Sequence, residues 1–336
     1  MPIKFSCVMD TPVKFQHQAL LWALTLLERG GLRPEDLVVH AMEGTPTEQV
    51  ELLRATGIQV DPVRRYSRVH PFLNKLRQLE SETLQAADHV VLSDTDLAFR
   101  APVGPWIGGD RPRIKIVDVA NPPLQIWRAL FKAAGFSAAP RAALTSLDGV
   151  ETYANNCNGG LYILPQAVFA ALRTAWPRWV EWVLGQRRIL GRFQSHVSQI
   201  SFALAMEEMG IEVDLLPLAL NFPTNFPLTY LAGKDMTPEV IHYHANLDRM
   251  GNLAPIGLEK VDAAIREINA LMASRADTSL MQAYRRRIAI ANGLPARTQH
   301  QVRRVVRRLR KLARCEGMKA YGIIQRRLRG ERGWRP

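Results

Sequence analysis

Two aspartates, Asp94 and Asp96, stand one residue apart at the end of the apolar run Val90–Leu92. Such a run is typical of a strand that is covered on both faces, and ionised carboxylates at its end are costly unless something pairs with them. In an open α/β sheet, ligands bind at that edge. Two carboxylates there suit Mg²⁺ or Mn²⁺, which keep positions open for the phosphate oxygens of a nucleotide. The alternative is that a strand-end aspartate only caps the next turn.

The segment Val240–His244 offers a third ligand for such an ion. Side chains alternate along a strand, so His242 and His244 are expected on the same face. Histidine is a common ligand of metals. The spacing does not tell which of the two would touch the ion. A late-strand histidine can instead bond to a backbone carbonyl, which would make it structural.

The chain up to Asp96 alternates between strand and helix patterns. The predicted strands are Ile3–Met9, Leu37–Ala41 and Ile58–Val63, and the predicted helices are Phe15–Arg29, Thr47–Ala55 and Pro71–Leu84. This order predicts a mostly parallel, doubly wound α/β sheet flanked by helices. The loop Asp10–Pro12 would then lie on the same sheet edge as the two aspartates, and that edge could hold a nucleotide.

The order beyond Phe99 is less regular. The predicted elements are the strand Ile114–Val119, a short helix near Ile126–Ala134, the strand Leu161–Leu164, the helix Ala167–Leu184 with an interruption near Pro177, the helix Gln194–Met209 and the short strand Glu212–Leu216. Two irregular segments, Asn121–Gly149 and the proline-containing loop Asn221–Tyr230, separate some of them. Segments of this kind often form substrate loops.

The composition is that of a folded protein. Of the 336 residues, 47% are hydrophobic, which permits a full-sized core. No apolar run reaches the length of about 18 residues that a membrane span needs, and the first residues lack a signal-peptide pattern, so a cytoplasmic protein is predicted. The three cysteines, Cys7, Cys157 and Cys315, lack the spacing of a zinc or redox site and are expected to be reduced.

Positive charge is concentrated at the C-terminus. Of the 44 Lys and Arg residues, 14 lie in residues 297–336 with two acids, which leaves 30 basic and 29 acidic residues in residues 1–296. We therefore predict a body at 1–290, a linker at 291–301 and a basic helical tail at 302–336.

Apolar residues recur at helical spacing from Val302 to Ala313, and basic residues fill the other sides of this segment. A basic amphipathic helix over residues 302–314 predicts binding to an anionic membrane surface, peripherally and on the cytoplasmic side. Clustered arginines also neutralise nucleic-acid phosphates, although nucleic acid is not the partner we expect. The remaining alternative is a helix that packs its apolar side on the body.

Three features resemble, in order and approximate spacing, the GT-A glycosyltransferases, most closely the family 8 type that uses nucleotide sugars. They are Asp94 and Asp96 at a strand end, the strand entry Asn158–Gly160, and the late histidine. The resemblance covers roughly residues 3–255. It implies that the two aspartates and a histidine, His242 before His244, hold Mn²⁺ (or Mg²⁺) against the donor diphosphate. Asp96 and His242 would bind the ion directly, and Asp94 either directly or through water and the ribose.

The same resemblance implies further contacts with the donor. Lys75 stands where the family keeps a basic residue, and Gln199 resembles part of a pair near the transferred sugar, although Ser198 replaces the expected acid. The family's Lys-Pro-Trp segment is absent, and Arg249 is the candidate phosphate contact there; Lys75 and Arg249 could also be solvated surface cations. The loop Cys7–Thr11 would hold base and ribose. The donor-binding candidates are Cys7, Met9, Asp10, Thr11, Lys75, Asn158, Gly160 and Arg249, and the catalytic candidates are Asp94, Asp96 and Gln199.

The function expected from this resemblance is transfer of a hexose from a nucleotide sugar, expected to be a UDP-sugar, to a saccharide or lipid-linked saccharide. It implies surface polysaccharide or lipopolysaccharide synthesis and retention of configuration, although the sequence identifies neither a nucleophile nor a general base. The cation would stabilise the leaving diphosphate as a Lewis acid. One alternative is a sugar-phosphate nucleotidyltransferase, but its glycine- and arginine-rich phosphate loop is absent after the first strand. The other is a non-catalytic membrane or nucleic-acid adaptor that acts through the basic tail.

Overall fold

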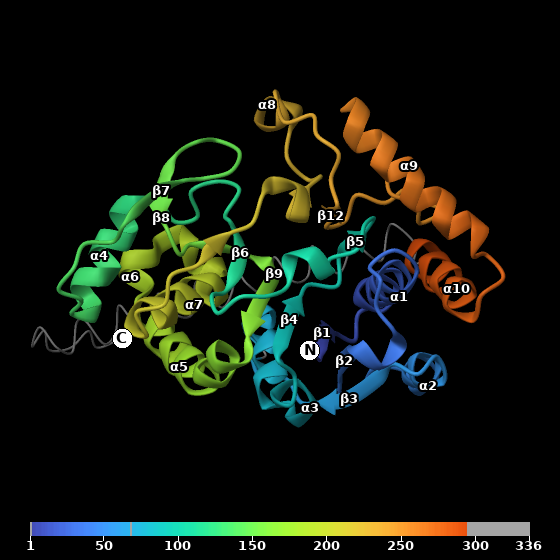
Figure 1. The fold of residues 1–336 in the computed structure, drawn as a ribbon, viewed down its shortest axis with the longest axis horizontal. Coiled ribbons are helices and arrows are strands. Elements are labelled where there is room, and N and C mark those ends of the chain that lie inside the picture. The colour runs from blue at the N-terminus through green and yellow to red at the C-terminus, as the bar shows by residue number, and fades with distance from the viewer. Residues whose placement is uncertain (1, 68, 294–336) are drawn as a thin grey trace, which may run out of the picture. The chain divides into compact units, whose positions relative to one another are not determined.

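The computed structural model describes residues 2–67 and 69–293. A seven-stranded sheet forms the centre of the described chain (Figure 1). Its strands, in spatial order, are β10 (Asp214–Leu215), β6 (Arg113–Ile116), β9 (Cys157–Pro165), β4 (His89–Ser93), β1 (Ile3–Met9), β2 (Leu37–Met42) and β3 (Gln59–Val63). Within this sheet β9 runs antiparallel to β4 and β6, and every other neighbouring pair is parallel. The predicted mostly parallel α/β sheet is confirmed.

Two smaller sheets accompany the central one. The first contains β11 (Phe222–Pro223), β12 (Val240–His242) and β5 (Leu97–Phe99), and the second contains β7 (Ala142–Leu144) and β8 (Glu151–Tyr153). The α-helices are α1 (Val13–Glu28), α2 (Thr47–Ala55), α3 (Glu82–Gln85), α4 (Leu124–Ala134), α5 (Gln166–Gly185), α6 (Arg187–Leu190), α7 (Val197–Glu208), α8 (Leu228–Leu231), α9 (Glu259–Ser274) and α10 (Ser279–Gly293). The 3-10 helices are η1 (Pro34–Asp36), η2 (Pro71–Glu80), η3 (Gly104–Trp106), η4 (Gly191–His196) and η5 (Leu218–Asn221).

Helices cover both faces of the central sheet because its strand residues alternate between two apolar clusters. Phe5 and Cys7 on β1, with Val91 on β4, belong to the cluster that also contains α1 and α9 side chains. Val90 and Leu92 on β4 belong to the other cluster, together with α5 and α7 side chains. Side chains of a strand point alternately to opposite faces, so these apolar runs are covered on both sides.

Two predicted helices differ from the structure. The segment predicted as one helix over Pro71–Leu84 is the 3-10 helix η2 followed by α3, because Ser81 has an extended backbone and caps α3 by accepting a hydrogen bond from the Leu84 N–H at 3.4 Å. The predicted interruption near Pro177 is wrong. Helix α5 continues through this proline, and Trp176 and Trp179 are buried on either side of it.

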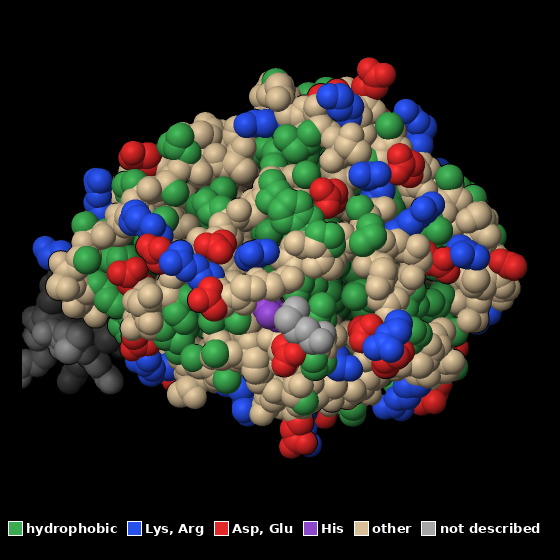
Figure 2. All heavy atoms as spheres, in the orientation of Figure 1, with side chains coloured by type: hydrophobic (Ala, Val, Ile, Leu, Met, Phe, Trp, Pro, Cys, Tyr) green, Lys and Arg blue, Asp and Glu red, His purple; other side chains and the backbone are tan. Residues whose placement is uncertain are grey.

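The surface of the body carries both signs of charge. Figure 2 shows basic and acidic side chains interspersed over one face, as the nearly neutral composition of this region predicts. Among the described residues no helix combines the length and apolarity that crossing a membrane requires. The predicted basic tail at 302–336 lies outside the described residues, and so does the predicted linker beyond Gly293, which is the last residue of α10.

Two buried histidines make stability depend on pH. Burial lowers the pKa of His40 on β2 to about 4, and burial, aided by the charge of Lys14, lowers that of His17 on α1 to about 4. A histidine in an unfolded chain titrates near pH ~6.5, so protonation favours the unfolded state as the pH falls from about 6.5 to 4. Above that window both histidines are neutral in the folded and the unfolded chain, and their burial costs no stability through protonation. Within the window the free energy of unfolding falls as the pH falls. At about pH 5, each histidine should cost about 2 kcal/mol.

Urea unfolding of the wild type and of His40→Gln at pH ~7.5 and ~5 measures this effect. The free energy of unfolding should fall by about 2 kcal/mol more in the wild type than in the variant, because glutamine does not titrate. Equal losses in the two proteins would show that His40 is not the group responsible.

Candidate functional site

The turn that carries the two aspartates is fixed to the central sheet. Strand β4 ends at Ser93, whose hydroxyl accepts a hydrogen bond from Trp22 Nε1 at 2.8 Å and donates one to the Ser6 carbonyl at 3.2 Å. The Asp94 N–H donates to the Gly160 carbonyl at 2.9 Å. The chain then leaves the central sheet and begins β5 in the second one. These contacts set the position of both carboxylates.

Pairing of β5 with β12 brings the late histidine to this turn. The two strands are antiparallel, and His242 is paired with Leu97. Just beyond the paired residues, the Tyr243 N–H donates to the Asp96 carbonyl at 3.0 Å. The strand register therefore places a histidine beside an aspartate that is distant in the sequence.

Asp96, His242 and His244 form one cluster. Nε2 of His242 lies 3.2 Å from Asp96 Oδ1, and Nδ1 of His244 lies 3.7 Å from Asp96 Oδ2. The two imidazole rings stack with their centroids 3.8 Å apart. His244 follows the end of β12 with a φ of 53°, a left-handed conformation. Both histidines that the strand pattern singles out therefore reach the same carboxylate.

The donor atoms of this cluster fit a divalent cation. One atom from each of the three side chains lies within 4.8 Å of the others. One carboxylate oxygen and two imidazole nitrogens suit Mn²⁺ and similar transition-metal ions better than Mg²⁺, which favours oxygen ligands. The cluster thus provides a candidate metal site.

The charge state of the cluster also suits a cation. Burial disfavours the charge on Asp96, but the neighbouring His242 and His244, with Lys14 on α1, lower its pKa to about 2. Burial and the nearby His242 lower the pKa of His244 to about 3, against the opposing effect of Asp96. Asp96 is therefore ionised and His244 neutral near pH ~7, as metal ligands must be.

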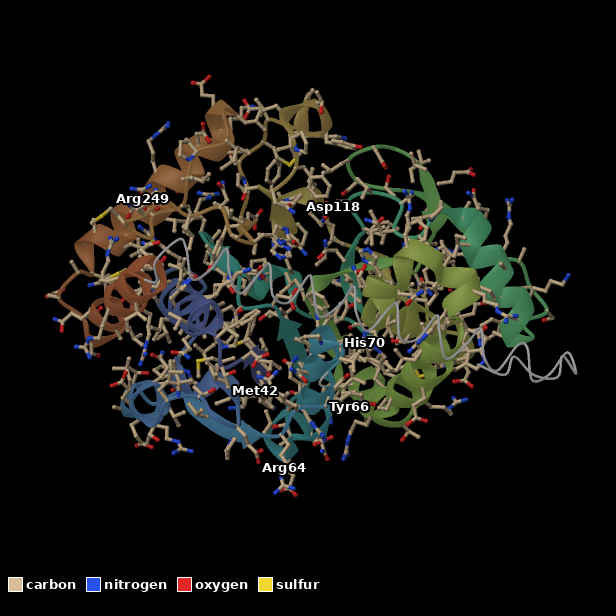
Figure 3. The ribbon with its side chains drawn as sticks, turned by 180° about the vertical axis from the view of Figure 1, so that it is seen from behind. Met42, Arg64, Tyr66, His70, Asp118 and Arg249 are labelled. Atoms are coloured by element: carbon tan, nitrogen blue, oxygen red, sulfur yellow. The ribbon has the colours of Figure 1, made fainter. Side chains whose placement is uncertain are left out.

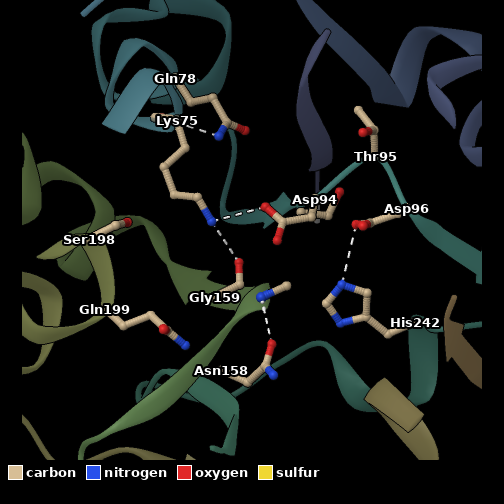
Figure 4. Close-up of polar contacts among 12 residues, drawn as sticks. Lys75, Gln78, Asp94, Thr95, Asp96, Asn158, Gly159, Ser198, Gln199 and His242 are labelled. Carbon is tan, nitrogen blue, oxygen red and sulfur yellow. Dashed lines mark hydrogen bonds and ion pairs between the residues drawn. The ribbon is translucent and has the colours of Figure 1, made fainter. Parts of the chain in front are cut away.

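Asp94 lies outside this cluster and has a different partner. Its Oδ1 is 3.0 Å from Lys75 Nζ, which also donates to the Gly159 carbonyl at 2.8 Å. Figure 4 shows Lys75 reaching Asp94 from one side while His242 reaches Asp96 from the other. Sequence reasoning put both aspartates in the metal set, whereas the structure brings only Asp96 together with the histidines and joins Asp94 to Lys75.

The segment Asn158–Gly160 needs glycine because it passes close to the cluster. A Cβ on Gly160 would lie 2.8 Å from His242 Cε1, which is too close for an unshifted ring. The Gly160 N–H donates to Asn158 Oδ1 at 2.8 Å, so the asparagine holds the glycine in this position. The Asn-x-Gly pattern thus has a local steric reason.

Gln199 lies beside the same strand. It donates from Nε2 to the Cys157 carbonyl at 3.2 Å, and its Oε1 lies 3.0 Å from His196 Nδ1. Its neighbour Ser198 is buried. At the position where the family resemblance implies an acid, the structure therefore has a buried hydroxyl rather than a carboxylate.

The loop after β1 is only partly available to a ligand. The side chains of Cys7 and Met9 are fully buried, and burial raises the pKa of the Cys7 thiol, so these two could contact a nucleotide only through their backbone. Asp10 forms an ion pair with Arg65, with its Oδ1 2.6 Å from Nη2. Thr11 accepts a hydrogen bond from the same guanidinium at 3.0 Å. The donor contacts predicted for this loop remain predictions.

Arg249 is exposed on the turn Asp248–Asn252. This turn packs on α10, where the Tyr284 hydroxyl donates to the Gly251 carbonyl at 2.5 Å. Figure 3, seen from behind, shows Arg249 near α9 and α10 and well apart from Asp118. Its predicted phosphate contact also remains a prediction.

Three residues that sequence reasoning missed act on the cluster, two through hydrogen bonds and one through its charge. Asn221 Oδ1 lies 2.9 Å from His242 Nδ1, and Gln18 donates from Nε2 to the His244 carbonyl at 2.6 Å. Lys14 is the cation on α1 whose charge acts on the cluster, and it lies one helical turn before Gln18. No local pattern marks these residues, because their partners are distant in the sequence.

The fold resembles solved structures, although no protein-family model and no curated protein sequence matches the chain. The galactosyltransferase LgtC, in complex with donor and acceptor sugar analogues, matches with a TM-score of 0.52 and 13% identity over 81% of this chain and 96% of that one. An active-site mutant of LgtC gives a TM-score of 0.51 with the same identity and coverage. Mouse xyloside xylosyltransferase 1 in its apo form is more distant, with a TM-score of 0.45 and 11% identity over 73% of this chain and 98% of that one.

At this level of identity the likeness establishes architecture rather than activity. The chain has the α/β fold of the GT-A glycosyltransferases, with a mostly parallel seven-stranded sheet between helices. In this fold the Asp96 cluster lies beyond the carboxyl end of β4, at the edge where open α/β sheets bind ligands.

Proposed function

We propose that this protein is a metal-dependent glycosyltransferase of the family 8 type, which moves a sugar from a nucleotide sugar to a saccharide acceptor. The observation that carries the proposal is the cluster of Asp96, His242 and His244 at the ligand-binding edge of a GT-A fold. The Asp94–Lys75 pair beside it supplies a second charged contact for the donor.

The chemistry follows from where charge develops. Breaking the bond between sugar and phosphate leaves a nucleoside diphosphate, and a Mn²⁺ ion held by the cluster would act as a Lewis acid on that leaving group. Asp96 would supply the anionic ligand, and the two imidazoles would supply nitrogen donors. Asp94 and the Gly159 carbonyl already orient the Lys75 ammonium group, so it is held in place for a contact with the donor.

We propose transfer with retention, on the family resemblance and on the place of Gln199. This side chain is near the transferred sugar in the proposed family, and here it is oriented by bonds to Cys157 and His196. Ser198 offers no carboxylate, so the residue at that position cannot serve as a carboxylate nucleophile. Nuclear magnetic resonance of the anomeric proton in the first product formed tests the stereochemistry, and an inverted product would refute retention.

The donor that we propose is a UDP-sugar, and the acceptor a saccharide or lipid-linked saccharide of a surface polysaccharide or lipopolysaccharide. The experiment is a panel of nucleotide sugars with Mn²⁺ or Mg²⁺, read by nucleoside-diphosphate release and by protection from thermal unfolding. We expect Mn²⁺-dependent stabilisation by UDP compounds. If no nucleotide stabilises the protein with either ion, the proposed function fails. Release of pyrophosphate from a nucleoside triphosphate and a sugar 1-phosphate, supplied in a parallel reaction, would indicate a nucleotidyltransferase instead.

We also propose that the basic segment 302–314, outside the described residues, brings the protein to the inner face of the cytoplasmic membrane. Each basic residue near an anionic surface contributes about 1 kcal/mol, so binding should be strong at low salt and weak at high salt. Flotation with anionic and with neutral vesicles measures it. Equal flotation of the full chain and a 1–296 truncation on anionic vesicles would contradict this proposal.

A further inference from the structure

A line of polar side chains, all buried except the half-buried Asn158, leads away from the Asp96 cluster. At its far end Lys115, on β6, donates a hydrogen bond to Asp118 Oδ1. Both side chains are buried, with exposed fractions of 1% and 5%. Ser146 donates to the same carboxylate oxygen at 3.0 Å. A buried carboxylate with these partners is a fixed hydrogen-bond acceptor.

This acceptor sets the orientation of the next side chain. Asn158 points its Nδ2 at Asp118 Oδ2, at 2.8 Å. Its Oδ1 must then face the other way, where it accepts from the Gly160 N–H at 2.8 Å and from Asn221 Nδ2 at 3.2 Å. Donors on one side and a carboxylate on the other leave a single satisfactory orientation of the Asn158 amide.

The orientation of Asn158 sets that of Asn221, which in turn sets the orientation of the His242 ring. Because Asn221 uses its Nδ2 toward Asn158, its Oδ1 faces His242 Nδ1, at 2.9 Å. An amide oxygen only accepts, so Nδ1 of His242 must carry the hydrogen. The other ring nitrogen, Nε2, is the one that faces Asp96 at 3.2 Å. The chain of bonds therefore decides which nitrogen the ring presents to the cluster.

We propose that Asp118, Asn158 and Asn221 are positioning residues that fix the ring of His242, so that it offers Nε2 to a divalent cation; this rests on the metal site of the proposed function. Partners of this kind orient metal-binding histidines and raise their basicity, and their loss typically weakens metal binding about 10- to 100-fold. His244 differs, because its Nδ1 faces Asp96. The two histidines are thus expected to bind through different ring nitrogens.

Asn221→Leu tests the proposal, because leucine is similar in size and cannot accept the hydrogen bond. We expect its dissociation constant for Mn²⁺, measured by electron paramagnetic resonance without nucleotide, to rise about 10- to 100-fold. The matched control is Asn156→Leu. Asn156 is also fully buried and also hydrogen-bonded, but it bonds to the Asn121 and Pro122 carbonyls and Thr152, outside this chain of bonds. Equal Mn²⁺ affinities in the two variants would overturn the proposal.

A second measurement uses only the wild type, so it does not depend on whether Asn221→Leu folds. Nitrogen-15 magnetic resonance spectra of the wild type show which ring nitrogen of His242 carries hydrogen, once the His242 signals have been assigned by through-bond correlations. We expect Nδ1 of His242 to be protonated, and a ring with a bare Nδ1 would overturn the proposal even if Asn221→Leu is unstable. If the wild type binds no Mn²⁺, the proposed function fails, while these spectra still decide the role of Asn221.

Discussion

Asp96→Asn is expected to lower turnover of the nucleotide sugar by about a thousandfold or more. Asparagine keeps the size of the side chain but removes the charge that faces His242 at 3.2 Å and His244 at 3.7 Å. The site then loses its anionic ligand, and the cation that would stabilise the leaving diphosphate is held far less tightly. Initial rates of diphosphate release across a Mn²⁺ titration measure the loss.

The matched control for this variant is Asp110→Asn, because Asp110 is exposed and lies outside the site. We expect it to retain the wild-type rate and Mn²⁺ dependence. Urea unfolding of both variants separates a local loss of metal from a general loss of structure. If Asp96→Asn keeps more than about a tenth of the wild-type rate at saturating Mn²⁺, the assigned role of this carboxylate is wrong.

Gly160→Ala is expected to weaken Mn²⁺ binding about a hundredfold and to destabilise the fold by about 1–3 kcal/mol. The added Cβ would lie 2.8 Å from His242 Cε1 and 2.9 Å from its Nδ1. The ring has little freedom to move away, because Asn221 and Asp96 contact its two nitrogens. Mn²⁺ binding and the free energy of unfolding are the two measurements.

Gly185→Ala provides the control for this substitution. Gly185 ends α5, and a Cβ there would meet no atom within 4 Å. It should therefore leave Mn²⁺ binding unchanged, and helix propensity alone would make it slightly stabilising. A Gly160→Ala protein that binds Mn²⁺ as tightly as Gly185→Ala would show that the close approach does not constrain His242.

Sequence reasoning recovered the elements whose signals are local. The apolar run before Asp94 predicts β4, because a buried strand needs apolar residues in sequence. Glycines indicate the ends of the early helices, because their backbone freedom lets the chain turn there. The parallel order followed from the alternation of strands and helices. These features fixed the sheet edge at which the site lies.

The composition of the Asp96 cluster needed the structure. Whether His242 or His244 would lie beside Asp96 depended on the pairing of β12 with β5 and on the left-handed backbone of His244, and the local sequence pattern indicates neither. The family resemblance already separated Asp96, as a direct ligand, from Asp94, which could bind directly or through water and the ribose. The structure adds their partners, since Lys75 approaches Asp94 and the histidines approach Asp96.

The residues that orient the cluster were beyond a single sequence for the same reason. Asn221 reads as the start of a proline-containing loop, and Asp118 reads as the end of a short strand. Their roles arise from hydrogen bonds between segments that only the folded chain brings together, such as the bond from Asn158 to Asp118. Side-chain networks of this kind have no periodic signature.

Electron spin echo spectroscopy of Mn²⁺ bound in the presence of UDP tests the central claim that Asp96, His242 and His244 hold the catalytic cation. The account predicts modulation from two imidazole nitrogens in the wild type, reduced to one in His242→Gln and to one in His244→Gln. Bound Mn²⁺ without imidazole modulation, or no bound Mn²⁺ at all, would contradict it.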